Sequence, residues 1–368
     1  MKLHHYLTVL FTGFLLSCNS MGSDPEGERQ QRIVQSSQYN AEKGKFENPV
    51  VILLSTGRPW TTILYEMLFN GEGREPSAKL PEEPPALSEF NLKSKDIRFI
   101  WFGHSTLLLE IDSKRILIDP VFSDYAAPFP VMVKRFQAPV FNIDQIPDVD
   151  IVLISHDHYD HLDYETISKL KKRDIQYIAP LGVGAHLESW GIDKNKITEL
   201  DWWDSDVIQG LQFTCTPSQH FSGRGMFNRN STLWSSWSIH GESQRIFYSG
   251  DSGYAEHYKE IGERLGPFDL TFLENGAYSL DWKFVHQLPE EGVQAHIDLQ
   301  GKTMVPVHWG MFNLALHTWY DPVIRVTTEA ERRGVKVLVP KLGQLVTNMQ
   351  NYVQQDWWIP VIEPPGLP

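Results

Sequence analysis

The chain of 368 residues is long enough for one large globular domain with an extension, and its 41% hydrophobic and 21% charged residues are typical of folded proteins. This composition excludes fibrous and intrinsically disordered classes. The formal net charge of −13 argues against a nucleic-acid partner, because proteins that bind phosphate backbones do so through basic surfaces.

The N-terminal segment, residues 1–18, is predicted to be a lipoprotein signal peptide. Its apolar stretch, residues 6–16, is too short to remain in a bilayer as a spanning helix. The tetrapeptide Leu-Leu-Ser-Cys at its end resembles a bacterial lipobox, in which Cys18 becomes the lipidated first residue of the mature protein. An ordinary secretory signal cleaved a few residues later is the alternative. We therefore expect a lipid-anchored protein of the bacterial cell envelope. The residue after the cysteine is Asn19 and not Asp, which by the usual enterobacterial sorting preference indicates the outer membrane.

Residues 19–95 are predicted to form a tether and an N-terminal arm. The first part, residues 19–45, is polar and has the composition of a flexible linker. Apolar residues at helical spacing follow Pro59 and predict a helix over 60–68. A Pro/Glu-rich stretch over 75–90 then predicts an extended strap. The arm either packs on the main domain, or helps to cover an active-site mouth or touches lipid.

From residue 96 to residue 350 short β runs alternate with helices, and residues 351–368 form a C-terminal tail. Strands interleaved with helices predict an α/β sandwich with its helices outside the sheets. The predicted strands cover residues 97–102, 107–111, 115–118, 150–154, 211–216, 234–239, 245–249, 269–273, 303–307 and 336–339. The predicted helices cover residues 163–172, 183–190, 254–265, 289–300 and 322–333.

A cluster of histidine and aspartate follows directly after the predicted strand 150–154. It contains His156, His158, Asp160 and His161 at the spacing H-x-H-x-D-H. Neutral imidazoles and carboxylates are suitable zinc ligands. The first two histidines can face one metal, and the turn that follows lets Asp160 and His161 reach a second metal nearby. The spacing therefore predicts a metal site at the end of this strand.

Four ligands from one loop cannot complete two metal sites, so further donors must come from the ends of other strands. His220 follows the predicted strand 211–216, Asp251 follows 245–249, and His308 follows 303–307. We expect these polar groups to converge with the 156–161 cluster at one edge of the sheets.

This order of residues resembles the metallo-β-lactamase superfamily over residues 96–350. The resemblance implies an αβ/βα four-layer sandwich and two zinc ions per chain. By the family's pattern one zinc is bound by His156, His158 and His220, the other by Asp160, His161 and His308, and Asp251 bridges the two. Asp119, in the family's first motif, is expected to hold an imidazole by a hydrogen bond rather than to bind metal.

Further blocks resemble the N-acylphosphatidylethanolamine-hydrolysing phospholipase D family. They are residues 101–106, 201–203, 217–220, 229–234 and 266–278, then His286 before 289–291, and 307–310. Upstream of residue 96 no convincing match exists.

The resemblance implies a zinc-dependent phosphodiesterase whose phospholipid substrate, N-acylphosphatidylethanolamine, is hydrolysed to phosphatidate and an N-acylethanolamine. Asp160, Asp251 and His286 are the expected catalytic residues, His286 as the group that positions substrate or donates a proton, and His104 is expected to support the site through hydrogen bonds. A lactonase or another metal-dependent ester hydrolase of the same fold is one alternative, and a non-catalytic zinc-binding envelope lipoprotein is another. His/Asp sites also accept iron or manganese.

Overall fold

The computed structural model describes residues 19–52, 57–85, 89, 92–129 and 132–362. The predicted lipidation site, Cys18, and the rest of the predicted signal peptide lie outside the described residues. Within the described residues, no helix combines the length and the apolar character that crossing a membrane requires.

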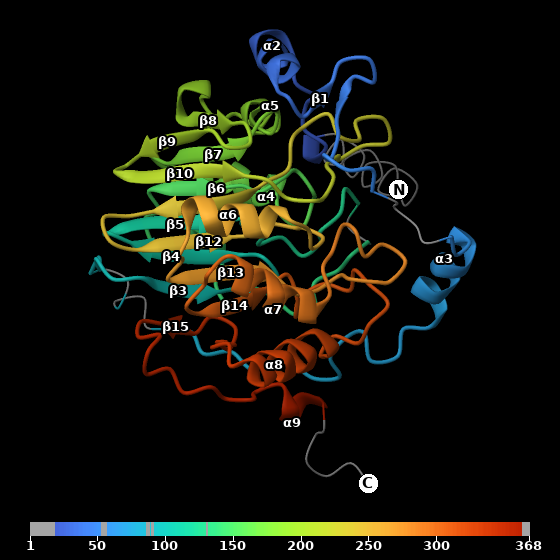
Figure 1. Ribbon diagram of the computed structural model, residues 1–368, viewed down its shortest axis with the longest axis vertical. Helices are drawn as coiled ribbons and strands as arrows, with labels where there is room; N and C mark the ends of the chain where they lie inside the picture. The colour runs from blue at the N-terminus through green and yellow to red at the C-terminus, as the bar shows by residue number, and fades with distance from the viewer. Residues whose placement is uncertain (1–18, 53–56, 86–88, 90–91, 130–131, 363–368) are drawn as a thin grey trace, which may run out of the picture.

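Two β-sheets lie face to face and form the centre of the molecule (Figure 1). One has seven strands, in the order β15-β3-β4-β5-β6-β7-β8, of which β5 to β8 run parallel. Its strands are β3 (Arg98–Trp101), β4 (Leu107–Ile111), β5 (Lys114–Ile118), β6 (Ile151–Leu153), β7 (Gln176–Pro180), β8 (Ile197–Leu200) and β15 (Leu345–Val346).

The second sheet has six strands, in the order β14-β13-β12-β11-β10-β9, of which β12, β13 and β14 run parallel. Parallel neighbours bring their carboxyl ends to the same edge, where loops can carry functional groups. Its strands are β9 (Ser205–Ile208), β10 (Leu211–Thr216), β11 (Ser236–His240), β12 (Arg245–Tyr248), β13 (Leu270–Glu274) and β14 (Met304–Val307).

Helices cover the outer face of each sheet and complete four layers (Figure 1). Ile167 and Leu187 place α4 (Tyr164–Leu170) and α5 (Gly184–Ser189) in the apolar cluster of the seven-stranded sheet. Ile261, Val293 and Val326 do the same on the six-stranded sheet for three other helices. Those helices are α6 (His257–Leu265), α7 (Pro289–Asp298) and α8 (Asp321–Arg333). The structure therefore has the four layers that the sequence predicts, with two sheets between two layers of helices.

The remaining elements lie outside the two large sheets and the five helices that cover them. Two of them, η2 and η3, are single turns of 3₁₀ helix that lead into the seven-stranded sheet. These elements are α2 (Gly27–Gln35), β1 (Tyr39–Asn40), β2 (Lys45–Phe46), α3 (Trp60–Phe69), η2 (Ile143–Gln145), η3 (Lys194–Lys196) and α9 (Ile359–Ile362).

Residues 19–46 are folded onto the domain, so the prediction of a flexible linker over 19–45 is wrong. Ile33 of α2 and Phe46 of β2 are fully buried in the central core. The Arg29 guanidinium binds the Glu199 carboxylate at 2.7 Å. Composition missed this because a few apolar anchors and an ion pair distant in sequence hold a segment that is otherwise polar.

Most predicted elements of the sandwich are present, but the prediction of a strand over 336–339 is wrong. There Val337 forms only an isolated bridge to Met304. Besides the short pair β1 and β2, four strands of the sandwich were not predicted: β7, β8, β9 and β15. β15 has only two residues, β9 is exposed at the edge of its sheet, and β7 and β8 show no clear apolar alternation in sequence.

Candidate metal centre

The loop after β6 carries the predicted ligand cluster, and its shape is fixed by a cap and a turn. The backbone nitrogens of His161 and Leu162 both donate to the carbonyl of His158, at 3.0 and 2.8 Å. Asp163 then caps α4 by accepting from the backbone nitrogens of Glu165 and Thr166. This tight turn points successive polar side chains toward the sheet edge.

Two buried residues absent from our predictions hold this loop in place. Arg224 donates through Nη1 to the carbonyls of Asp157 and Leu162, at 2.6 and 2.8 Å. The Asp157 carboxylate accepts from the backbone of Gly223 at 2.7 Å and from the hydroxyl of Thr232 at 2.8 Å. No sequence spacing signals these contacts, because they join segments about 65–75 residues apart.

Three imidazoles converge as the first group of the centre. Nδ1 of His158 lies 2.9 Å from Nε2 of His156 and 3.2 Å from Nε2 of His220. Asp251 adds an oxygen 3.8 Å from His156 and 3.6 Å from His220. One ligand atom from each of these four residues lies within 4.8 Å of all the others, so the group can hold one metal ion.

The second group contains Asp160, His161, His308 and also His104. Oδ2 of Asp160 lies 3.5 Å from Nε2 of His161 and 3.4 Å from Nε2 of His308. Nε2 of His104 contacts the same oxygen at 2.8 Å. His104 thus lies where the sequence places it, hydrogen-bonded to a ligand candidate.

Asp251 lies between the two groups. Besides its contacts with the first group, it approaches Nε2 of His308 at 3.1 Å through Oδ2 and Nε2 of His161 at 3.2 Å through Oδ1. The preceding Gly250 has φ of +54°, and a Cβ there would lie 2.6 Å from the Ser235 carbonyl. Glycine therefore permits the turn that carries Asp251 to the midpoint.

Asp119, at the end of β5, supports the second group from behind and is fully buried. Oδ2 of Asp119 lies 2.7 Å from Nδ1 of His161, and this pairing leaves Nε2 of His161 directed at the centre. The same carboxylate accepts from the hydroxyls of Ser155 and Tyr248, each at 2.5 Å. Such an arrangement orients an imidazole ligand and raises its basicity.

The two groups differ in their electrostatics. Burial keeps the pKa values of His156 and His158 below the usual range, and repulsion from neighbouring histidines lowers the pKa of His156 further. Burial also acts to lower the pKa of His308, but the carboxylates of Asp251 and Asp160 raise that pKa to about 10. The second group therefore favours positive charge.

The arrangement fits bound cations. Nε2 of His161, Nε2 of His308 and Oδ1 of Asp251 are buried and form no hydrogen bond, although unpaired buried polar atoms are costly. In the first group, Nε2 of His156, Nδ1 of His158 and Nε2 of His220 point at one another. Their lone pairs repel unless a proton or a metal lies among them. Imidazole and carboxylate donors suit zinc, and also iron and manganese.

Glu274 and His286 adjoin the centre. Nδ1 of His286 lies 2.9 Å from Oε2 of Glu274, and the backbone nitrogen of Gln287 donates to Oε1 at 2.8 Å. Burial raises the pKa of the Glu274 carboxyl. We did not predict Glu274, but the signal was present, because this carboxylate ends an apolar strand as Asp251 follows one.

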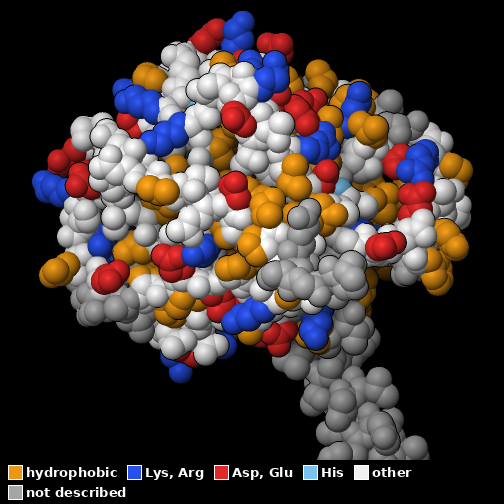
Figure 2. Space-filling model, turned by 90° about the horizontal axis from the view of Figure 1, so that it is seen from below, with side chains coloured by type: hydrophobic (Ala, Val, Ile, Leu, Met, Phe, Trp, Pro, Cys, Tyr) orange, Lys and Arg blue, Asp and Glu red, His pale blue; other side chains and the backbone are white. Residues whose placement is uncertain are grey.

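The metal centre opens into a cleft of about 380 Å³ with mainly apolar walls. Figure 2 shows histidine surface reaching the exterior between hydrophobic side chains. The residues that line the cleft are Met67, His158, Asp160, Phe221, Arg229, Asp251, Ala277, Trp282, Val285, His286, His308 and Leu314. Met67 belongs to α3, so the N-terminal arm contributes to the wall, which was one of the two predicted alternatives.

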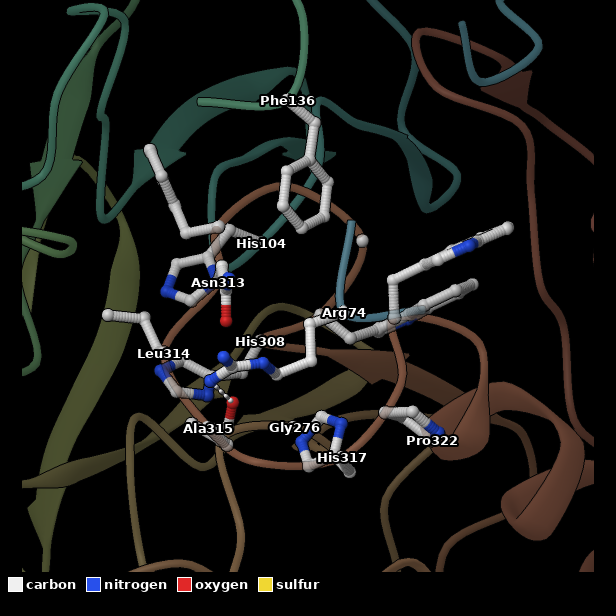
Figure 3. Close-up of a pocket in the computed structure, with 15 residues that line it drawn as sticks. Arg74, His104, Phe136, Gly276, His308, Asn313, Leu314, Ala315, His317 and Pro322 are labelled. Atoms are coloured by element: carbon white, nitrogen blue, oxygen red, sulfur yellow. Dashed lines mark hydrogen bonds between the residues drawn. The ribbon is translucent and has the colours of Figure 1, made fainter. Parts of the chain in front are cut away.

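A second, smaller cavity of about 20 Å³ lies beside His104 and His308 (Figure 3). The buried Arg74 reaches into it from the N-terminal arm and donates through Nη1 to the carbonyl of Ala315, at 3.5 Å. Nη2 of Arg74 donates to the carbonyl of Met67 at 2.8 Å. Arg74 thus ties the end of α3 to the loop that follows His308.

Comparisons with known proteins agree with this geometry. The family model described as "Beta-lactamase superfamily domain" matches residues 114–309. N-acyl-phosphatidylethanolamine-hydrolyzing phospholipase D 1 of Caenorhabditis elegans is 33% identical, over 75% of this chain and 83% of its own. Outer membrane protein RomA of Klebsiella pneumoniae is 50% identical over 26% of this chain and 70% of its own. The solved structure of Igni18, a metallo hydrolase of Ignicoccus hospitalis, superposes with a TM-score of 0.53 at 19% identity, covering 68% of this chain and 97% of its own.

Proposed function

Because the chain belongs to the metallo-β-lactamase superfamily and has the fold of its metal-dependent hydrolases, we propose that it is a two-zinc phospholipase D. Its proposed reaction is hydrolysis of N-acylphosphatidylethanolamine to phosphatidate and an N-acylethanolamine. The observation that carries the proposal is the position of Asp251 between two ligand groups. The name of the C. elegans relative supports the choice of substrate.

In this proposal His156, His158 and His220 hold one zinc, and Asp160, His161 and His308 hold the other. Asp251 is shared between them, and Asp119 and His104 orient the ligands that they contact. When bound, the two zinc ions supply an activated water and offset negative charge on the phosphoryl oxygens. Zinc is the metal that we expect, because it is the usual partner of such His/Asp sets in hydrolases.

His286 is the proposed proton donor to the leaving group. Nδ1 of His286 is paired with the Glu274 carboxylate, so Nε2 is the nitrogen available to the cleft that His286 lines. The alkoxide of an N-acylethanolamine is a poor leaving group, and protonation of its oxygen lowers the barrier to P–O cleavage. Glu274 would stabilise the protonated imidazole and fix its orientation.

The cleft walls suit a lipid. Met67, Trp282 and Leu314 offer apolar surface for acyl chains, and Arg229 offers guanidinium donors to a phosphate or an acyl carbonyl. The guanidinium of Arg229 is stacked on the Phe221 ring, 4.4 Å from its centroid, and this contact holds it at the wall.

We further propose that the mature chain is anchored through Cys18 in the bacterial outer membrane. The sequence around Cys18 and the partial similarity to outer membrane protein RomA support this location. A lipid anchor would hold the cleft close to its phospholipid substrate.

The test is metal analysis of the purified chain together with a lipid-product assay. We expect about two zinc ions per chain and release of N-acylethanolamine from micellar substrate. His158→Ala and Asp251→Asn should abolish release, because each removes a ligand candidate. Full activity in both variants, or in metal-free protein, would contradict the catalytic assignment.

Substrate choice separates the narrow proposal from its alternatives. N-acylated and plain phosphatidylethanolamine are compared as substrates, and an acyl lactone is included. Equal hydrolysis of the two phospholipids would retain the phosphodiesterase and remove the headgroup specificity. Hydrolysis of the lactone alone would indicate a lactonase, and bound zinc without any hydrolysis would indicate a binding protein.

A further inference from the structure

Large apolar side chains are exposed on three segments around the cleft. In α3, Trp60 is 71% exposed and Phe69 is 68% exposed, although such side chains are normally buried in the protein interior. In the loop 222–228, Met226 is 90% and Phe227 96% exposed. The third segment contains the exposed Leu280. We call the exposed apolar residues of the three segments the apolar rim, and its members are Trp60, Leu64, Tyr65, Phe69, Met226, Phe227 and Leu280. Clustered exposure of this kind marks an interaction surface.

The segments of the apolar rim adjoin one another at the mouth of the cleft. Met67 of α3 lines the cleft, as do Phe221 and Arg229 on the two sides of the loop 222–228. Arg58 links α3 to the segment that carries Leu280. It binds Glu66 of α3 at 2.6 Å and Asp281, the residue after Leu280, at 2.8 Å. Figure 1 shows α3 standing out from both sheets at one side of the molecule.

The N-terminal end of the described chain lies beside this rim. The carbonyl of Ser20 accepts from Nη2 of Arg224 at 2.6 Å, and Arg224 precedes Met226 by two residues. The carbonyl of Asn19 accepts from the indole nitrogen of Trp190 at 2.7 Å. Ser20, two residues after the proposed site of the lipid anchor, is therefore held next to the loop that exposes Met226 and Phe227.

We propose that the apolar rim is the face by which this protein docks on a phospholipid bilayer, with the cleft mouth toward the lipid. The proposal rests on the proposed lipid substrate and anchor, and it assigns the orientation of the domain. Tryptophan, tyrosine and phenylalanine favour the interface between acyl chains and headgroups. The net charge of −13 gives no attraction to anionic lipids, so apolar insertion must hold the rim in place.

The test uses the processed full chain, reconstituted on phosphatidylethanolamine/phosphatidylglycerol vesicles that contain brominated lipid. An environment-sensitive fluorophore is attached at Phe227→Cys, or at Val353→Cys as the matched control. Val353 is 78% exposed and lies between β15 and α9, away from α3 (Figure 1). The native Cys215 is fully buried, so it does not compete for the label.

We expect bromine to quench the probe at position 227 and not the probe at position 353. The double variant Trp60→Asp/Phe227→Asp should hydrolyse vesicle-embedded substrate about tenfold more slowly, with hydrolysis of a soluble phosphodiester unchanged. Val353→Asp should match the parent in both assays. Loss of activity toward the soluble substrate as well would indicate damage to the fold, which the tryptophan emission spectrum would show. In that case the quenching result alone decides whether the apolar rim docks on the bilayer.

Equal quenching at the two positions would overturn the docking proposal. So would a dimer of the parent chain that the double variant converts to a monomer, because the rim would then be covered by a second copy. The quenching measurement needs no catalysis. Quenching at position 227 without hydrolysis of any phospholipid would therefore support the docking face and refute the proposed function. Hydrolysis without quenching would support the proposed function and refute the docking face.

Discussion

The two halves of the metal centre share Asp251 but differ in charge. The first half consists of His156, His158 and His220, whose pKa values are lowered chiefly by burial. In the second half Asp160 lies among the imidazoles, and the carboxylate of Asp119 lies directly behind His161. Burial acts on both halves, yet the carboxylates raise the pKa values of His161 and His308 in the second half.

In the proposed function, this difference gives the two halves distinct tasks. In the first half, three imidazole nitrogens and the shared carboxylate of Asp251 can hold a cation. The second half has more carboxylates, so in the proposed reaction it would offer a stronger field to a cation beside the leaving group. The second half is also the one that adjoins Glu274 and His286. The predictions below test whether the halves act separately.

Asp160→Ala should produce the largest effect. It removes the carboxylate that contacts the second-half histidines and leaves the first half intact. We expect bound metal to fall from about two to about one ion per chain and kcat to fall about a thousandfold. Metal analysis and steady-state kinetics check this. Retention of both ions would show that the second half does not depend on Asp160.

Glu274→Gln should lower kcat for the lipid substrate about a hundredfold, because the carboxylate no longer stabilises protonated His286. A phosphodiester with a nitrophenolate leaving group needs no proton donor, so its hydrolysis should change little. Glu274→Asp serves as the conservative control and should recover part of the activity. An equal loss on both substrates would reduce Glu274 to a structural residue.

Asp119→Asn should weaken metal binding by about tenfold to a hundredfold in the second half, and by less in the first half, which Asp119 reaches only through the hydroxyl of Ser155. The amide preserves the shape of the carboxylate but no longer raises the basicity of His161. Titration with a competing chelator measures both affinities. Weakening of the first half to the same extent would show that the two halves do not act independently.

The smallest predicted effect concerns a histidine outside the metal centre. Burial lowers the pKa of His296 to about 4, below the value near 6.5 of an unfolded chain. The unfolded chain therefore binds more protons below pH 6.5, and stability falls as the pH falls through the window from 6.5 to 4.

From pH 6.5 to pH 5.5 this loss amounts to about 1 kcal/mol. His296→Asn should remove that part of the pH dependence. Denaturant unfolding of the parent and the variant at both pH values measures the difference. If the free energy of unfolding fell equally with pH in the two proteins, His296 would not be the source of this loss.

The sequence alone determined which polar side chains follow the apolar strands. Polar ligands that follow apolar strands can be predicted because the strand pattern and the carboxyl-end rule are both local. The seven predicted ligands are brought together in the structure, and the fold class is confirmed. Sequence also located the apolar helix after Pro59, which the structure gives as α3.

Only the tertiary structure decided which contacts support and orient these elements. Arg224 fixes the ligand loop and the N-terminal segment, and Glu274 pairs with His286, through contacts that no local pattern encodes. Residues 19–46 are folded for the same reason, since their partners lie far along the chain. The exposure of α3 likewise depends on what packs against it. Local sequence sets the type of each side chain and element, whereas burial and pairing follow from the whole fold.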